Sequence, residues 1–317
     1  MVHLNMFLPL VTHPDYSYPF ADKHRFPMQK FALLHRYLQE QGIARAENTY
    51  RPARAKMSLL ELAHCPDYLQ RFVSNTLDKS ELRRMGLPWS EGLVRRSLIS
   101  PVGTLLTCHL ALKHGAACHL AGGTHHAHHD FASGYCILND LAIAAKSLLS
   151  HTHIEHGKIK KVMIFDVDVH QGDGTARILE EEANIFTCSV HCEKNFPARK
   201  ATSDLDVNVP IKADDDEYLQ IMKAGFEQAI SLSQPDFIIY DAGVDVYEHD
   251  PLGLINVSIE GIRQRDSYVL QRAKTLGIPI ATVIGGGYDK DQQALAQRHA
   301  IVVEEAYRIF IAENLAD

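Results

Sequence analysis

The chain has 317 residues, of which 46% are hydrophobic, so it can bury the core of one large α/β domain. Its formal net charge of -7 at pH 7 argues against the basic surface that non-specific nucleic-acid binding requires, and we expect no direct nucleic-acid partner. The 6 cysteines form no CxxC pair, and no apolar stretch approaches the roughly 18 residues of a membrane span. These features predict reduced thiols, no membrane contact and a cytoplasmic location.

About the first hundred residues are predicted to be mainly helical. Pro27 opens a helix that closes near Gly42. Ser58 and Glu61 have the spacing of a capping box, which predicts the start of a second helix. We expect this second helix to stop near Pro66, because proline cannot continue a helix.

The rest of the chain divides into a long loop and a series of βα units. The segment from 85 to 101 is punctuated by Gly, Pro and Ser and holds the only Trp, so we expect a long loop there. From residue 115 onward, short apolar runs alternate with amphipathic stretches. This alternation predicts a mostly parallel sheet with helices on both faces.

Unusual polar residues follow several of the predicted strands. In an open parallel sheet the carboxyl ends of the strands share one edge, and ligands bind there. We therefore expect separate segments to converge on one crevice: His125 with His126, Asp166 to His170, Ser189 to His191, Asp241 to Asp245, and Gly285 to Tyr288.

The run VMIFDVDVH, from Val162 to His170, predicts a metal site. It places Asp166, Asp168 and His170 on one face of a strand end. Two buried carboxylates repel each other unless a cation or a shared proton offsets their charge. Asp168, His170 and Asp245 would supply two anionic ligands and one neutral ligand, which leaves coordination positions open for chemistry. This donor set suits Zn²⁺ best, with Fe²⁺ or Co²⁺ as substitutes.

The adjacent histidines His125 and His126 are candidates for proton transfer. Neighbouring imidazoles can divide that work if carboxylates set their tautomers, and Asp166 and Asp173 are available to do so. Tyr288 follows a run of three glycines and could donate its phenol hydrogen to a developing oxyanion.

Together these stretches resemble the zinc-dependent histone deacetylase superfamily, which includes acetylpolyamine amidohydrolases and acetoin-utilisation proteins. The matching segments lie between residues 122 and 288: GGTHHAHHDFASGYCILND, FDVDVHQGDGT, SVH, AGVD followed by DPLG, and IGGGY. HRFPMQK and DVHQGDGT are similar to the class IV branch and its bacterial relatives. The resemblance implies an arginase-deacetylase-like α/β fold, with a central, mostly parallel eight-stranded sheet, forming one catalytic domain over residues 1–317.

The resemblance also implies catalytic roles. His126 would be the general base and then the general acid, with His125 as its electrostatic partner. Asp166 would support His125, Asp173 would support His126, and Tyr288 would polarise the acyl carbonyl. Zinc would be held by Asp168, His170 and Asp245.

Two further sets of residues match binding positions of the family. The walls and base of a substrate tunnel would be formed by Gly134, Tyr135, Phe196, Leu252 and Gly286. A structural K⁺ or Na⁺ ion would be bound by Asp166, Asp168, His170, Ser189 and Val190. The family usually has Phe where Tyr135 stands, so this tunnel would gain a hydroxyl group.

These features predict a zinc-dependent hydrolase that removes an acyl group from Nε-acyl-lysine in proteins or from an acylpolyamine. The alternatives are an acyl-lysine binding module with weak catalysis and a dimanganese, arginase-type ureohydrolase. FDVDVH alone would fit a haloacid-dehalogenase-type phosphatase equally well, but that family needs no histidine pair. The sequence does not define an oligomeric state. We expect surface positions for His128, His129, His151, His153 and His156.

Overall fold

The computed structural model describes residues 7–21, 24–151 and 159–313. An eight-stranded sheet forms its centre, in the order β2-β1-β3-β8-β7-β4-β5-β6, and every neighbouring pair is parallel. This confirms the predicted sheet. The strands are β1 (Leu10–Val11), β2 (Thr49–Tyr50), β3 (Ala116–His119), β4 (Val162–Asp166), β5 (Ile185–Cys192), β6 (Leu205–Val209), β7 (Phe237–Asp241) and β8 (Ile280–Val283).

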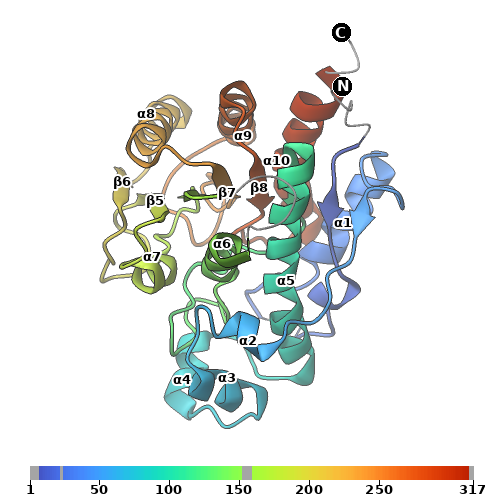
Figure 1. Ribbon diagram of the computed structural model, residues 1–317, viewed down its shortest axis with the longest axis vertical. Helices are drawn as coiled ribbons and strands as arrows, with labels where there is room; N and C mark the ends of the chain where they lie inside the picture. The colour runs from blue at the N-terminus through green and yellow to red at the C-terminus, as the bar shows by residue number, and fades with distance from the viewer. Residues whose placement is uncertain (1–6, 22–23, 152–158, 314–317) are drawn as a thin grey trace.

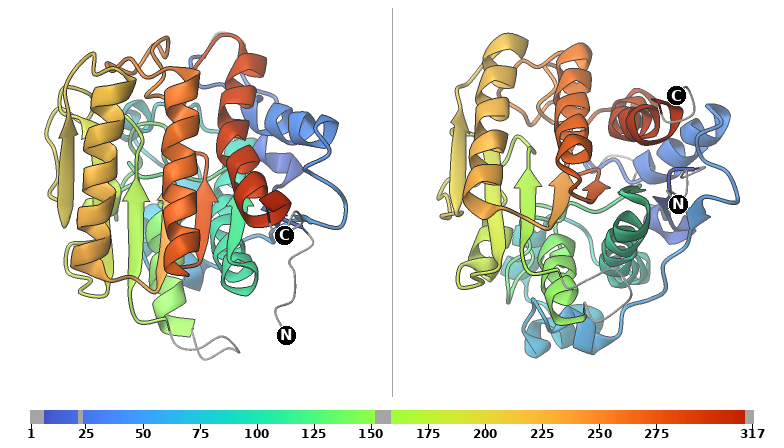
Figure 2. Two further views of the ribbon diagram at one scale, coloured as in Figure 1. Left: turned by 90° about the horizontal axis from the view of Figure 1, so that it is seen from above. Right: turned by 45° about the horizontal axis from the view of Figure 1, so that its top comes forward.

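Helices cover both faces of the sheet, as predicted. One layer is formed by α8, α9 and α10, and the opposite layer by α5, α6 and α7 (Figures 1 and 2). No helix in the described ranges is both long and apolar enough to cross a membrane. The helices are α1 (Lys30–Glu40), α2 (Met57–Leu60), α3 (Pro66–Val73), α4 (Lys79–Met85), α5 (Glu91–His114), α6 (Asp140–His151), α7 (Asp173–Leu179), α8 (Asp215–Ser233), α9 (Ile259–Leu276) and α10 (Gln292–Tyr307).

The central strands bring polar residues to one edge of the sheet. Strands β4 and β7 are fully buried and read as continuous apolar runs until their last residues, which is typical of a sheet covered on both faces. The last residue of β4, Asp166, pairs in register with Asp241 of β7 and with Ser189 of β5. Three of the predicted polar segments therefore meet at the carboxyl edge.

The long loop predicted for residues 85–101 is wrong. Helix α4 ends at Met85 with Gly86 in the left-handed conformation, and the side chain of Ser90 caps α5 by accepting from the Leu93 amide. Pro101 lies buried inside α5. A proline in a helix costs about 3 kcal/mol or more, so packing against the sheet must outweigh this local preference.

The predicted helix boundaries near Pro27, Ser58 and Pro66 also need correction. Helix α1 begins at Lys30, and α2 spans only Met57–Leu60 without a side-chain cap. Pro66 is the first residue of α3 instead of the end of a helix. Proline suits the first helical position, because the amide hydrogen it lacks would have no partner there.

Candidate active site

Two carboxylates and one imidazole converge just beyond the carboxyl ends of β4 and β7. The Nδ1 atom of His170 lies 3.0 Å from Asp168 Oδ1 and 3.0 Å from Asp245 Oδ2. All three side chains are buried, and one donor atom of each lies within 4.8 Å of the others. Burial raises the pKa of Asp245 to about 6, and the charge of Asp168 contributes further. A mixed oxygen and nitrogen donor set of this kind fits a catalytic divalent metal ion.

Backbone amides orient the carboxylates of this group. Val169 N donates to Asp245 Oδ1 at 2.9 Å, and Gly286 N donates to Asp168 Oδ2 at 2.7 Å. A Cβ atom at position 286 would collide with both carboxylates. Only glycine therefore lets the backbone approach the group this closely, which assigns Gly286 a steric role.

The two adjacent histidines each bind their own carboxylate. His125 Nδ1 lies 2.7 Å from Asp166 Oδ2, and His126 Nδ1 lies 2.6 Å from Asp173 Oδ1. Burial and then the charge of His125 lower the pKa of His126 to about 4. Burial alone would lower the pKa of His125 as well, but the carboxylates of Asp166 and Asp168 raise it well above its ordinary value. His126 is consequently uncharged near neutral pH, whereas His125 is protonated.

Asp173 has a second histidine partner that the sequence analysis placed at the surface. His128 Nε2 lies 3.1 Å from Asp173 Oδ2, and its side chain is half-buried, so the surface prediction for His128 is wrong. His129 is exposed, as predicted. One feature of the sequence could have predicted this contact: His128 follows His126 by two residues. The side chains of the remaining histidines with surface predictions, His151, His153 and His156, lie outside the described residues.

The turn that carries the histidine pair is held by Asp140, a residue without a predicted role. Its carboxylate accepts from the amides of Gly123, at 3.2 Å, and Thr124, at 2.8 Å. The Thr104 hydroxyl of α5 donates to the same carboxylate at 2.5 Å. Asp140 is the last residue of CILND, which is part of a segment that resembles the family. The sequence therefore did contain a signal that Asp140 has a role.

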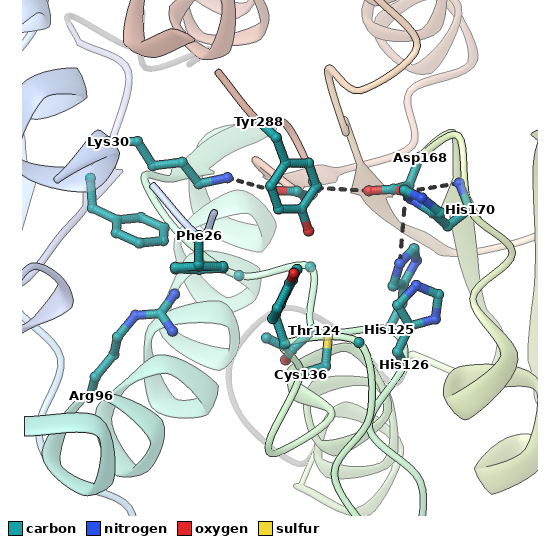
Figure 3. Close-up of a pocket in the computed structure, with 17 residues that line it drawn as sticks. Phe26, Lys30, Arg96, Thr124, His125, His126, Cys136, Asp168, His170 and Tyr288 are labelled. Atoms are coloured by element: carbon teal, nitrogen blue, oxygen red, sulfur yellow. Dashed lines mark hydrogen bonds and ion pairs between the residues drawn. The ribbon is translucent and has the colours of Figure 1, made fainter. Parts of the chain in front are cut away.

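Tyr288 lies beside the candidate metal group. Its amide donates to Asp250 Oδ2 at 2.7 Å, and its ring lies 5.9 Å from that of Tyr135. Burial raises the pKa of Tyr288 well above its ordinary value, and the charges of Asp245 and Asp168 raise it further. The phenol therefore keeps its proton and can act as a hydrogen-bond donor. Figure 3 shows Tyr288 next to Asp168 and His170.

A surface cleft of about 630 Å³ leads down to these residues. The predicted tunnel residues Gly134, Tyr135, Phe196 and Leu252 line it, together with His126, His170 and Tyr288. Phe196 stands edge-on to the His126 imidazole, with ring centroids 4.8 Å apart and an interplanar angle of 89°. Three basic side chains also line the cleft, those of Arg83, Arg84 and Lys194.

A second group of potential cation ligands lies on the β7 side of Asp166. His125, Asp166 and Asp241 offer donor atoms within 4.8 Å of one another. Within the described ranges, neither carboxylate oxygen of Asp241 has a hydrogen-bond partner. Ser189 lies on the opposite side of Asp166, in β5, next to Val190. The monovalent cation site at those two residues stays a prediction.

An all-parallel sheet with buried Asp and His groups at its carboxyl edge is an α/β architecture that could hold a metal ion there. The histone deacetylase domain model matches residues 24–305, and the chain belongs to the histone deacetylase family.

Individual relatives agree with this family. An uncharacterised protein of Picosynechococcus sp. is 46% identical over 96% of this chain and 100% of its own length. Histone deacetylase 2 of Arabidopsis thaliana is 30% identical over 87% of this chain and 73% of its own. A solved structure of an HDAC homolog complexed with SAHA has a TM-score of 0.79 at 21% identity, covering 96% of this chain and 89% of that one. At this level of identity, the structural match shows the fold.

Proposed function

We propose that the protein is a zinc-dependent amidohydrolase that removes an acyl group from Nε-acyl-lysine, acting as one catalytic domain over residues 1–317. The observation that carries the proposal is the buried group of Asp168, His170 and Asp245, which lies beside an uncharged His126 and a protonated Tyr288. Bound zinc, or Fe²⁺ or Co²⁺ in its place, supplies a Lewis acid that polarises the amide carbonyl and lowers the pKa of water.

The chain's own residues divide the proton transfers. His126 takes a proton from the attacking water through Nε2, because Asp173 occupies its Nδ1. The same imidazole then delivers a proton to the leaving amine. His125 keeps its charge and stabilises the negative charge that develops nearby. Tyr288 donates its phenol hydrogen to the carbonyl oxygen as that oxygen becomes an oxyanion.

The mouth of the cleft favours acyl-lysine in a protein or peptide over an acylpolyamine. Arg83, Arg84 and Lys194 are exposed there, and no carboxylate lines the cleft within the described residues. A polyamine would bring further positive charges to this basic rim and would be repelled. A peptide with acidic residues next to the acyl-lysine would be attracted.

The dimanganese ureohydrolase is the weaker candidate. In a two-metal centre the ions lie about 3.5–4 Å apart and usually share a bridging ligand. The two groups of potential ligands have no residue in common, because one contains Asp168, His170 and Asp245 and the other contains His125, Asp166 and Asp241. The lack of a shared residue favours a single catalytic ion over a bridged pair.

Metal analysis combined with an acetyl-lysine peptide assay tests the proposal. We expect one equivalent of zinc per chain, peptide turnover, loss of turnover with a chelator and recovery when zinc is returned. Two equivalents of Mn²⁺ and arginine hydrolysis would support the ureohydrolase instead. Stoichiometric zinc without turnover of any acyl-lysine peptide would favour the binding module.

A further inference from the structure

Arg265 is a buried cation to which the proposed reaction gives no role. It lies in α9, and its side chain is 0% exposed. Its charge is balanced by Asp266, whose Oδ1 accepts from Arg265 Nε at 2.9 Å and from the Tyr240 hydroxyl at 2.6 Å. The desolvation of a buried ion pair can exceed the attraction between its members, so the pair alone does not explain why this arginine is buried.

The far end of the guanidinium reaches the loop that leads to the candidate metal ligand Asp245. Arg265 Nη1 donates to Gly243 O at 2.6 Å, and Nη2 donates to Ala242 O at 3.4 Å. Both loop residues are buried and lie beyond the last residue of β7, so their carbonyl oxygens are outside the strand. A buried carbonyl without a donor is unfavourable, and the forked guanidinium supplies donors to two of them at once.

The peptide group between Gly243 and Val244 is held from both ends. Its carbonyl accepts from Arg265, and its N–H donates to Gly286 O at 2.8 Å. The C=O and N–H of a trans peptide point in opposite directions within one plane, so the two bonds together fix that plane. A charged donor at the carbonyl also polarises the peptide and strengthens the hydrogen bond that its N–H makes.

This clamped peptide contacts both carboxylates of the candidate metal group through its neighbours. Val244 directly precedes Asp245 in the chain. Gly286, whose carbonyl accepts from Val244, donates its own amide to Asp168 Oδ2 at 2.7 Å. Gly243 packs against the same carboxylate, since a Cβ atom there would lie 2.6 Å from Asp168 Oδ2. Rotation of the clamped peptide would therefore displace groups on which both ligands depend.

We propose that Arg265 is a positioning residue of the metal centre, which acts by clamping the peptide between Gly243 and Val244 and so holding the Asp245 loop in the position that metal binding requires. The inference rests on the proposed function for the identity of the ion and for the link to catalysis. Arg265 acts through the loop and not on the substrate. Groups that orient metal ligands in this way typically contribute about 10- to 100-fold to metal affinity or activity.

A second group of the same composition on α9 provides a matched control. Arg272 donates to the two carboxylate oxygens of Glu227, in α8, at 2.7 Å and 2.9 Å. The Tyr268 hydroxyl donates to the same carboxylate at 2.8 Å. This group is half-buried and joins α9 to α8. Its replacement measures the general effect of removing an arginine–carboxylate pair from this helix.

The main test is the double variant Arg265→Met/Asp266→Leu, which removes the clamp together with its counter-ion and so leaves no unpaired charge buried. We expect zinc affinity, measured by competition with a chromophoric chelator, to fall by about 10- to 100-fold. The visible absorption spectrum of the Co²⁺-loaded protein should change, because it reports the geometry of the ligands. For an acetyl-lysine peptide, kcat should fall with little change in KM. Parental zinc affinity and an unchanged spectrum would overturn the inference.

Controls separate positioning from general stability. Arg272→Met/Glu227→Leu should keep the parental zinc affinity and cobalt spectrum even if thermal unfolding shows a loss of stability. If Arg265→Met/Asp266→Leu does not fold, Arg265→Lys decides the question, because lysine keeps the charge but lacks the fork that reaches Gly243 and Asp266 together. Zinc affinity below that of Arg272→Lys would then support the inference, and equal affinity would refute it.

The metal measurements distinguish this inference from the proposed function, because neither zinc affinity nor the cobalt spectrum requires turnover. If the parental protein binds zinc but cleaves no acyl-lysine peptide, and the Arg265 variant loses zinc affinity, the positioning role stands and the proposed function fails. If the parental protein cleaves these peptides and the variant matches it in zinc affinity, spectrum and kcat, only the inference fails.

Discussion

The carboxylate of Asp173 accepts a 2.6 Å hydrogen bond from His126 Nδ1. Since this bond fixes the proton on Nδ1, the Nε2 lone pair of His126 stays free to face the cleft. The second carboxylate oxygen binds His128, which prevents Asp173 from rotating away. Two histidines from one turn therefore share a single carboxylate at the start of α7.

Replacing Asp173 with Asn should disable the base while leaving the metal in place. An amide in this position favours the wrong histidine tautomer, and we expect kcat to fall by roughly a hundred- to ten-thousandfold. Steady-state kinetics with an acetyl-lysine peptide, together with zinc analysis, would measure this. Asp130→Asn changes an exposed carboxylate close to the same turn and serves as the control. Full activity in Asp173→Asn would show that His126 is not the general base.

On the acid side, kcat/KM should begin to fall only at an unusually low pH. His126 accepts a proton only when it is uncharged, and its pKa is lowered to about 4. Lowering the pH therefore protonates the base only near that value, so kcat/KM should hold from about pH 7 to about pH 5 and fall below it. Zinc content must be measured at each pH to separate protonation from metal loss. A midpoint near 6.5 with zinc retained would contradict this assignment.

Replacing Tyr288 with Phe removes one hydrogen-bond donor from the site. The loss of such an oxyanion donor should lower kcat by about a hundred- to a thousandfold with a smaller effect on KM. Tyr307→Phe, in α10 and away from the cleft, is the comparison variant. Parental turnover in Tyr288→Phe would show that another group polarises the carbonyl.

The Gly286→Ala variant should lose metal affinity. The added methyl group collides with the carboxylates of Asp168 and Asp245 and also displaces the amide that orients Asp168. We expect zinc affinity to fall by about 10- to 100-fold, as when other groups that orient metal ligands are altered. Gly277→Ala tests general backbone strain, because Gly277 has a φ of +68° but caps α9 with open space around it. Equal zinc affinity in the two variants would argue against the steric explanation.

Charge reversal at the cleft should change the preferred peptide. Arg83→Glu combined with Lys194→Glu turns a basic rim acidic, so the enzyme should shift from peptides with acidic flanks towards peptides with basic flanks. Exposed charge pairs contribute about 0.2–1 kcal/mol each, so we expect a shift of several-fold that weakens with added salt. Arg36→Glu, exposed on α1, should not change the preference. If neither the double variant nor added salt changes the preference for flanking residues, the basic rim does not select substrates.

Much of the fold could be predicted because its signals are local. A buried parallel strand reads as an apolar run, and its last residue marks the sheet edge where ligands gather. Asp166 and Asp241 could be placed at that edge without any knowledge of the partners of either strand. Strands β1 and β2 have two residues each, too few to produce a recognisable pattern.

The amino-acid sequence by itself determined the alternation of strands and helices, the polar strand ends and the candidate metal ligands, because these depend on short-range periodicity. Tertiary packing alone decided that Pro101 stays helical, that His128 turns inward to Asp173, and that Arg96 is buried while its neighbour Arg95 is exposed. Each of these outcomes depends on which surface of an element another element covers. The physical reason is that burial energy arises from contacts between residues far apart in the chain, and it exceeds the local preferences that sequence patterns record.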